Sequence, residues 1–477
     1  MVIAKIDHGE VRIVESFGEK IQLAAGMNEQ RNLTDDTMER GLSCLKGFAQ
    51  YTKNLPKNSL RIVGTNALRE ARNCTVFLQK AEEILGHSIE IISGREEARL
   101  IYLGVSHTIP SPQEKRLVID IGGGSTEFII GKNFEPLLRE SLHMGCVSFT
   151  QQFFHNKKIS QQNYKNAYTA ACLELLNIEQ SLLKLNWKHA IGSSGTIKAI
   201  ASTIHSANLG QGEINLEGIA WLKQEIFKTE DIKDLTFSGI KANRVSILPA
   251  GLAILEAIID TCQITQITFS EGALREGLLY DLVGRNKQED IRERTLNALM
   301  TRYHIDKKQA SRVEVKALEA LEQVSESWNL QETWHKEALS WAARTHEIGL
   351  DIAHYQYQKH SAYLIEHSDL AGFSKRDQQI LAFLVRSHRR NIPNDKLISF
   401  GKTGIHLLRL CILLRLAILF YHIRSTTNIP KVRIVAKENT FTCYFPDQWL
   451  DNNPLTKADF QRESNWLKKV DITFLAY

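Results

Sequence analysis

The sequence predicts an α/β fold over residues 1–283, followed by an all-helical domain over 284–425 and a small α+β domain over 426–477. Before Gly284, short β-rich runs are followed by Gly/Ser/Thr turns and then by helical patterns, which is typical of α/β folds. After Gly284, long stretches rich in Leu, Ala, Glu, Lys and Arg predict helices, and VRIVAKENTFTCYFP predicts a hairpin. A chain of 477 residues should form about two to four domains.

Composition indicates a globular protein of a reducing compartment. The chain is 43% hydrophobic and 24% charged and has only 9 prolines, which leaves no room for long disordered stretches. The net charge of +5 permits a polyanionic substrate but does not require nucleic acid. The 7 cysteines are odd in number and form no CxxC pair. This pattern favours free thiols and excludes a zinc ribbon.

The apolar segments predict a cytoplasmic protein. The N-terminal MVIAKIDHGEVRIV alternates and carries charges, unlike the apolar region of a signal peptide. The most apolar later run, LLRLCILLRLAILF, contains Arg409 and Arg415. We therefore interpret it as a buried helix instead of a membrane span.

Four strand–turn–helix segments provide candidate walls of one ligand site. Open α/β sheets bind ligands at the carboxyl ends of their strands, where such turns lie. The turns are small, hydroxylated and flanked by Arg or Glu, and they occur in LRIVGTNALREA, IEIISGREEARLIYLGV, HAIGSSGTIKAIAST and ITFSEGALREGLLYDL.

LVIDIGGGSTEFII, residues 117–130, predicts a glycine hairpin instead of a strand–loop–helix unit. LVID reads as a strand buried on both faces, and the apolar EFII resumes a strand after the turn. A Rossmann or Walker A loop needs a helix at this point, so both are disfavoured. Consecutive glycines let backbone N–H groups converge on an anion, while Asp120 could hold Mg²⁺ with help from Glu127. The alternative is an ordinary glycine turn capped by Asp120.

Two acidic residues, Glu96 and Glu97, stand in the first turn of a predicted helix after Ser93. Acidic residues stabilise a helix N-terminus by about 0.3–1 kcal/mol without any further role. A carboxylate at the mouth of a phosphate site is also a candidate general base for an attacking water.

GTNALREA and GSSGTIKAI offer hydroxyls and helix N-termini to anions, and Arg69 could clamp a phosphoryl group with two hydrogen bonds.

In the helical domain, His346-Glu347 partly matches a metal dyad. Glu replaces the usual Asp, however, and Leu350 stands where that motif has Lys. Satisfied or surface histidines are the favoured interpretation there.

These motifs, in this order, closely resemble the exopolyphosphatase and guanosine pentaphosphate phosphohydrolase family, and within it the long, four-domain bacterial exopolyphosphatases. The resemblance spans nearly the whole chain, through GTNALREA, SGREEARLIYLGV, VIDIGGGSTE, MGCVSF, GSSGTIKA, LPAGLAIL, GALREGLLYDL, HEIGL and HSAYLI. It implies two actin/Hsp70-like (ribonuclease H-like) lobes, over 1–102 and 103–283. It also implies that the helical domain is HD-like and degenerate.

Carried over residue by residue, the resemblance makes Glu97 the catalytic base and places Asp120 and Glu127 near Mg²⁺. The expected phosphate-binding residues are Gly122, Gly123, Gly124, Ser125, Arg69, Ser194, Gly195 and Thr196. Members of the family begin with a strand and a first phosphate loop of the type Asp-x-Gly-Ser-Asn-Ser, and Met1 stands just after the position of that loop. We therefore expect lobe I to lack its first strand and that loop, and MVIAKI to be an edge strand without its hairpin partner.

Three functions follow as hypotheses. The first is Mg²⁺-dependent, processive release of terminal phosphate from inorganic polyphosphate, with Glu97 activating water. The second is removal of the 5′-terminal phosphate of guanosine pentaphosphate (pppGpp). The third is a polyphosphate-binding protein with reduced turnover. We expect a homodimer that needs no nucleic acid and is cytoplasmic, with peripheral association at the inner face of the membrane also allowed.

Overall fold

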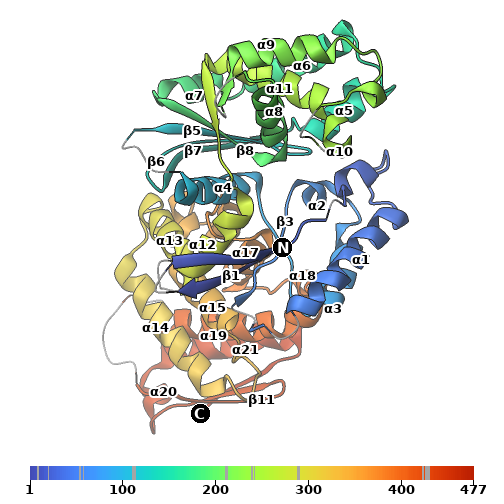
Figure 1. The fold of residues 1–477 in the computed structure, drawn as a ribbon. Helices are drawn as coiled ribbons and strands as arrows, with labels where there is room; N and C mark the ends of the chain where they lie inside the picture. Colours follow the sequence, from blue (N-terminus) through green and yellow to red (C-terminus); the bar gives the residue numbers. More distant parts are fainter. Residues whose placement is uncertain are drawn as a thin grey trace. The chain divides into compact units, whose positions relative to one another are not determined.

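The computed structural model describes residues 1–7, 10–19, 21–52, 55–56, 59–109, 114–209, 213–237, 240, 242–286, 290–421, 424 and 430–477. The chain forms two compact units, Met1–Ile291 and Arg292–Tyr477, and each is described by itself (Figure 1). The four-part division expected from the sequence stays a prediction.

A six-stranded sheet organises the first unit. Its strands run in the order β7-β6-β5-β8-β10-β9. Strand β5 pairs parallel with β8 and antiparallel with β6, and β10 pairs parallel with β8. The strands are β5 (Arg116–Ile121), β6 (Thr126–Lys132), β7 (Glu135–Leu142), β8 (His189–Ser193), β9 (Glu213–Asn215) and β10 (Gln266–Phe269).

Helices cover both faces of this sheet, because successive side chains of β5 point to opposite faces. Val118 packs with one face of α4 (Gly94–Thr108), whereas Leu117, Ile119 and Ile121 enter the larger core on the other side. Figure 1 shows α4 on one side of the sheet and α8 on the other. The first side also carries α12 (Leu274–Asn286), and the second carries α5 (Cys146–Phe153), α6 (Gln161–Leu175), α7 (Glu179–Lys184), α8 (Ser194–Ser206), α9 (Leu216–Ile226), α10 (Ala242–Val245) and α11 (Leu248–Cys262).

The first hundred residues form smaller sheets and a helical cluster. Strand β1 (Val2–Asp7) is an edge strand, as expected for MVIAKI, and it pairs antiparallel with β2 (Glu10–Ser16), which follows it. Among the described residues, no third strand joins that pair. Strands β3 (Val63–Gly64) and β4 (Glu90–Ile91) pair parallel. A separate apolar core holds α1 (Asp35–Thr52), α2 (Asn66–Glu70), α3 (Cys74–Leu85) and the short helix η1 (Leu23–Gly26) together.

The second unit packs helices and a three-stranded sheet around one core. That core runs without a break from Leu296 to Phe474, so the helical part and the hairpin segment are joined. Trp328 shows the junction, because its indole N–H donates to the carbonyl oxygen of Glu438 at 3.1 Å. The elements are α13 (Ile291–Arg302), α14 (Lys307–Val324), α15 (Thr333–Thr345), η4 (Ile348–Asp351), α16 (Tyr357–His367), α17 (Lys375–Ser387), α18 (Asn394–Ser399), α19 (Gly404–Tyr421), α20 (Trp449–Asn452), α21 (Pro454–Leu467), β11 (Arg433–Lys437), β12 (Thr440–Tyr444) and β13 (Thr473–Ala476).

Helix α19 contains the most apolar run of the chain. Residues 401–421 are long and apolar enough to cross a membrane by length and composition, but 61% of the most apolar stretch is buried inside this unit. Arg415, at 1% exposure, is ion-paired with Glu463 of α21. A buried arginine held by a second helix is what a core helix requires, which agrees with the sequence prediction.

Candidate active site

The glycine motif forms the predicted hairpin. Strand β5 ends at Ile121, β6 begins at Thr126, and the N–H of Gly122 donates to the carbonyl oxygen of Ser125 at 2.9 Å across the turn. The expected strand–turn–strand is therefore confirmed, and no helix begins at Gly123.

The turn leaves backbone donors available. The carbonyl oxygens of Gly122 and Gly123 accept N–H bonds from the start of α5, at 3.0 Å from Cys146 and 2.9 Å from Val147. Within the described part of the chain, the N–H groups of Gly123 and Gly124 have no acceptor. Unpaired N–H groups on successive glycines form a concave site for an anion. This arrangement is the chemistry that the glycine run predicted.

The start of α2 closes one side of this turn. A Cβ atom at Gly124 would overlap the side-chain oxygen of Asn66, the first residue of α2. Only glycine leaves room for this approach. The segment GTNALREA and the glycine hairpin are far apart in the sequence, but they contact each other in the fold.

Three buried carboxylates gather beneath the turn. Asp120 and Glu127 are direct cross-strand neighbours, so both point to the face of the sheet that α4 covers. Glu97 stands in the first turn of α4. Burial raises the pKa of all three carboxyl groups, that of Asp120 to about 7. The negative charge of Glu97 also raises the pKa of Asp120 and of Glu127. These charge effects act over short distances, so the three carboxylates lie near one another.

Each carboxylate has a distinct set of partners. Glu97 accepts a hydrogen bond from Arg69 at 2.8 Å, and that arginine lowers the pKa of Glu97 against the effect of burial. Glu127 accepts from the Ser141 hydroxyl at 2.9 Å. Ser193, the cross-strand neighbour of Asp120 on β8, lowers the pKa of Asp120 against the effect of burial. Asp120 and Glu127 have no Lys or Arg partner among the residues that the structure describes.

The two acidic residues of α4 have different surroundings. The N–H of Glu96 donates to the capping hydroxyl of Ser93 at 3.2 Å, as the sequence predicted for a helix start. The Glu96 carboxylate then turns away and binds Arg99 in two hydrogen bonds, at 2.8 and 2.9 Å. Arg99 in turn contacts Asp281 of α12 at 2.6 Å. Glu96 is therefore part of a buried ion network, and only Glu97 lies with Asp120.

Arg69 has a different partner from the phosphoryl group predicted for it. Its guanidinium donates to Glu97 and, at 2.9 Å, to the carbonyl oxygen of Ile92. These bonds fix the rotamer of the Glu97 carboxylate. The structure thus assigns Arg69 to positioning the candidate base, and its contact with phosphate stays a prediction.

The loop Ser194–Thr196, at the start of α8, lines a cavity together with the glycine turn. Ser194 has a φ of 92°, a conformation that costs a non-glycine residue about 1–3 kcal/mol and is typical of functional loops. The Thr196 hydroxyl donates to the Cys146 sulfur at 3.2 Å, so it is directed to α5. The Ser125 hydroxyl likewise stabilises the charged form of Glu127. The expected phosphate contacts of these two side chains stay predictions.

Arg244 is a residue of the site that the sequence analysis did not identify. A cavity of about 380 Å³ is lined by the three glycines of the turn, by Ser194, Gly195 and Thr196, and by Arg244 from α10. A Cβ at Gly195 would overlap the Arg244 guanidinium. Its segment, KANRVSILPAG, carries no turn signal of the kind that marked the other loops. The available signal was only an arginine just before a helix that begins with proline.

Magnesium fits the donor chemistry but has no complete protein site. Among the described residues, no group of three His, Cys, Asp or Glu side chains is arranged to hold a metal ion. Mg²⁺ usually keeps several waters and binds one or two carboxylates together with substrate phosphates. Asp120 and Glu127 supply two carboxylates of this kind beside the anion-binding turn. The residues present are thus compatible with Mg²⁺ held jointly with a phosphate substrate.

The family assignment follows from comparison with known proteins. Residues 2–286 match the Ppx/GppA phosphatase family, and residues 291–464 match Ppx/GppA phosphatase, domain III. The chain belongs to the Ppx/GppA phosphatase family. It is accordingly a hydrolase of phosphoanhydride bonds, and the family resemblance inferred from the motifs is confirmed.

Curated relatives span nearly the whole chain. The guanosine-5′-triphosphate,3′-diphosphate pyrophosphatase of Vibrio vulnificus is 38% identical over 98% of this chain and 93% of its own length. The protein of the same name from Pseudoalteromonas translucida is 36% identical over 98% and 94%.

Solved structures support the fold. An exopolyphosphatase from Cytophaga hutchinsonii has a TM-score of 0.54 at 24% identity and covers 59% of this chain and 93% of its own. The Ppx/GppA enzyme of Aquifex aeolicus has a TM-score of 0.50 at 24% identity, covering 58% and 93%. The predicted fold class, actin-like α/β lobes followed by a helical domain, is confirmed.

We expect Arg244→Ala to weaken substrate use, because a guanidinium beside the phosphate turn would contribute a charged hydrogen bond of about 1.5–3 kcal/mol. The kcat/KM for phosphate release should therefore fall by about 10- to 100-fold. The matched control is Arg294→Ala, an exposed arginine of α13. Equal activity of both variants would remove Arg244 from the site.

Proposed function

We propose that this protein removes the 5′-terminal phosphate of guanosine pentaphosphate, yielding guanosine tetraphosphate and inorganic phosphate. One observation carries the proposed chemistry: Glu97 lies close to the glycine turn. Arg69 holds the Glu97 carboxylate by a hydrogen bond. In the turn, the N–H groups of Gly123 and Gly124 have no acceptor among the described residues and can bind an anion. The substrate is proposed from the printed names of relatives that are 36–38% identical over nearly the full length.

The reaction needs a general base, a binding site for the terminal phosphoryl group and a water molecule in line with the bond that breaks. In the proposed mechanism the terminal phosphoryl group lies on the glycine turn, where N–H groups stabilise the charge on its oxygens. Glu97 accepts a proton from the attacking water as the new P–O bond forms, and the bond to the bridging oxygen of the next phosphate breaks. Burial raises the pKa of Glu97 towards the working range of a general base, while Arg69 keeps the carboxylate available.

The other carboxylates fit a supporting role. Asp120 and Glu127 would hold Mg²⁺, which neutralises phosphate charge during phosphoryl transfer. The Ser141 hydroxyl orients the Glu127 carboxylate.

A second cavity adjoins the phosphate turn and suits a branched substrate. It measures about 600 Å³ and shares Ala24, Asn66 and Gly124 with the first cavity. Its lining includes His143 and the ion pair of Arg31 with Glu70, whose side chains lie 2.6 Å apart. A nucleoside that carries a second diphosphate needs such additional space beside the phosphate turn, whereas the end of a linear phosphate chain does not.

Hydrolysis of linear polyphosphate, the first hypothesis from the sequence, is the second candidate. The glycine turn and Glu97 act only on a terminal phosphoryl group, so the same site would serve a polyphosphate end. The binding-only hypothesis does not fit a chain that retains the buried carboxylates and belongs to a phosphatase family.

Product analysis tests the proposal. Purified protein is incubated with Mg²⁺ and guanosine pentaphosphate, and the nucleotides are separated by anion-exchange chromatography. We expect guanosine tetraphosphate and one equivalent of phosphate, and a strongly reduced rate for Glu97→Gln. Release of the 3′-phosphates, or no hydrolysis by a folded protein, would contradict the proposal.

We expect Asp120→Asn to shift the Mg²⁺ requirement, because it removes one of two carboxylate charges at the proposed metal position. A magnesium titration of phosphate release should show that the concentration for half-maximal rate rises by about tenfold or more, a cost of about 1.4 kcal/mol in metal affinity. Asp260→Asn, an exposed aspartate of α11, is the control. An unchanged titration curve would place the metal elsewhere.

A further inference from the structure

A large cavity in the Arg292–Tyr477 unit has no part in the proposed reaction. Its volume is about 660 Å³, within the range of about 300–1,000 Å³ that is usual for small-molecule sites. Its walls come from η4, α16, the end of α17, α19 and α21, which share one continuous core. We call it the arginine–histidine pocket, defined by His346, His388, Arg389, Arg390, Arg462 and Trp466.

The lining carries surplus positive charge. Five arginines and three carboxylates line the cavity, and three of the arginines are ion-paired. Arg415 pairs with Glu463, and Arg462 pairs with Asp459 at 3.5 Å. Arg424 pairs with Glu347 at 2.8 Å and with Asp306, outside the lining, at 3.4 Å. Arg389 and Arg390 have no carboxylate partner within the described part of the chain. These two neighbouring guanidinium groups give the cavity lining its excess of positive charge, and an anionic ligand would neutralise it.

The backbone at Arg390 supports this interpretation. Its φ is 61°, in the left-handed region that favours glycine after a helix end, and α17 ends at Ser387. An L residue there costs about 1–2 kcal/mol. This conformation follows the end of α17 and fixes the backbone from which the Arg390 side chain leaves.

Two buried histidines form a neutral, polar side of the cavity. The Nδ1 atoms of His346 and His388 lie 2.8 and 2.6 Å from the carbonyl oxygens of Ala343 and Val385. A carbonyl only accepts, so each Nδ1 carries the proton and each Nε2 is an acceptor. Burial lowers the pKa of both residues, which keeps them uncharged near neutral pH. His388 Nε2 accepts from the Tyr357 hydroxyl at 3.1 Å.

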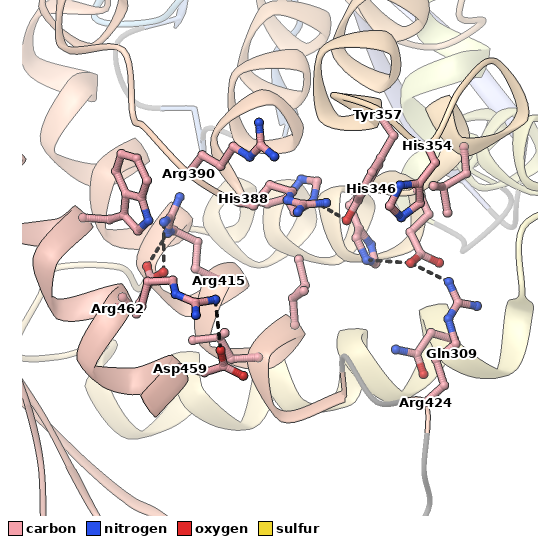
Figure 2. Close-up of a pocket in the computed structure, with 17 residues that line it drawn as sticks. Gln309, His346, His354, Tyr357, His388, Arg390, Arg415, Arg424, Asp459 and Arg462 are labelled. Carbon is pink, nitrogen blue, oxygen red and sulfur yellow. Dashed lines mark hydrogen bonds and ion pairs between the residues drawn. The ribbon is translucent and has the colours of Figure 1, made fainter. Parts of the chain in front are cut away.

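The cavity therefore offers two kinds of surface. Figure 2 shows His346, His354, Tyr357 and His388 gathered on one side and Arg415, Arg462 and Asp459 on the other. The Arg389 guanidinium lies over the Tyr357 ring, 5.0 Å from its centre, which connects the charged and the neutral parts. Trp466 and aliphatic residues of α19 add apolar surface.

We propose that the arginine–histidine pocket binds a small phosphorylated molecule of nucleotide size. Its phosphoryl oxygens contact Arg389 and Arg390, whose planar guanidinium groups match phosphate geometry. The uncharged part of a nucleoside phosphate would lie against Tyr357 and Trp466. The phosphoryl group can belong to a nucleoside phosphate or to a short inorganic phosphate chain. The site is separate from the catalytic carboxylates and does not depend on the proposed substrate.

Hydrogen–deuterium exchange of the full-length protein gives a local test. The probes are guanosine diphosphate and inorganic tripolyphosphate, each added separately, and the peptides observed cover residues 384–392 and 459–467. We expect a probe to slow exchange in both peptides of the wild-type protein and of Glu97→Gln. Protection by guanosine diphosphate alone identifies a nucleotide ligand, and protection by both probes shows that a phosphate chain is sufficient.

Charge removal completes the test. The probe concentration that gives half-maximal protection of residues 384–392 should rise about a hundredfold in Arg389→Ala/Arg390→Ala, because each lost charged contact weakens binding about tenfold or more. Arg294→Ala/Lys307→Ala removes the same charge from exposed positions of α13 and α14 and should bind normally. If the double variant fails to fold, Arg390→Ala alone should still lose about tenfold. The proposal is overturned if neither probe protects these peptides, or if the folded pocket variants bind as tightly as the control.

Discussion

Glu97→Gln lowers kcat for phosphate release by about 10²–10⁴-fold, the usual loss when a general base is removed. The substitution keeps the size of the side chain and its hydrogen bond to Arg69, but the amide cannot accept the proton of the attacking water. Glu97 lies with Asp120 and Glu127 under the anion-binding turn, so no described neighbour on α4 can replace it. The measurement is single-turnover phosphate release at saturating Mg²⁺.

Glu96→Gln is the matched control for this result. It changes the preceding residue in the same way, but Glu96 points into the network with Arg99 and Asp281. We expect near-normal kcat for the folded fraction and a lower stability. If kcat falls equally and only mildly in both variants, both residues serve only to stabilise the helix start, and Glu97 is not the general base.

Asp281→Ala lowers the free energy of unfolding of the Met1–Ile291 unit by about 3 kcal/mol, because removing one partner of a buried ion network leaves charges without compensation. Asp281, on α12, accepts from Arg99 at 2.6 Å and from Arg61 at 2.5 Å, and all three side chains are less than 10% exposed. The network ties α12 to α4, whose first turn carries Glu97.

Denaturant unfolding measures this effect, with Asp234→Ala as the control. Asp234 is exposed, and its removal should change stability by less than about 0.5 kcal/mol. If both variants unfold at the same denaturant concentration, the buried network does not contribute to the stability of this unit.

Local patterns in the sequence were sufficient for the fold and for the main site motif. The run LVID, the glycines and the resumed EFII follow rules that act within a dozen residues, and the hairpin formed as expected. The start of α4 at Ser93 is equally local, because a capping serine and first-turn acids are readable from spacing.

Contacts between distant segments could not be predicted in this way. Arg69 was expected to bind phosphate, but its Glu97 partner lies 28 positions away and is brought to it by the parallel pairing of β3 with β4. Arg244 enters the site through a packing contact with Gly195 that no local pattern encodes. The joint core of the helical and hairpin segments likewise depends on long-range packing, as with Trp328 and Phe441.

The substrate preference tests the central claim most directly. The kcat/KM for phosphate release is measured for guanosine pentaphosphate and for long-chain polyphosphate with the same protein, Mg²⁺ concentration and ionic strength. We predict that guanosine pentaphosphate is preferred by at least about tenfold, which corresponds to about 1.4 kcal/mol of additional transition-state binding in the cavity lined by Arg31 and His143. A preference of similar size for polyphosphate would contradict the account and would make this protein an exopolyphosphatase.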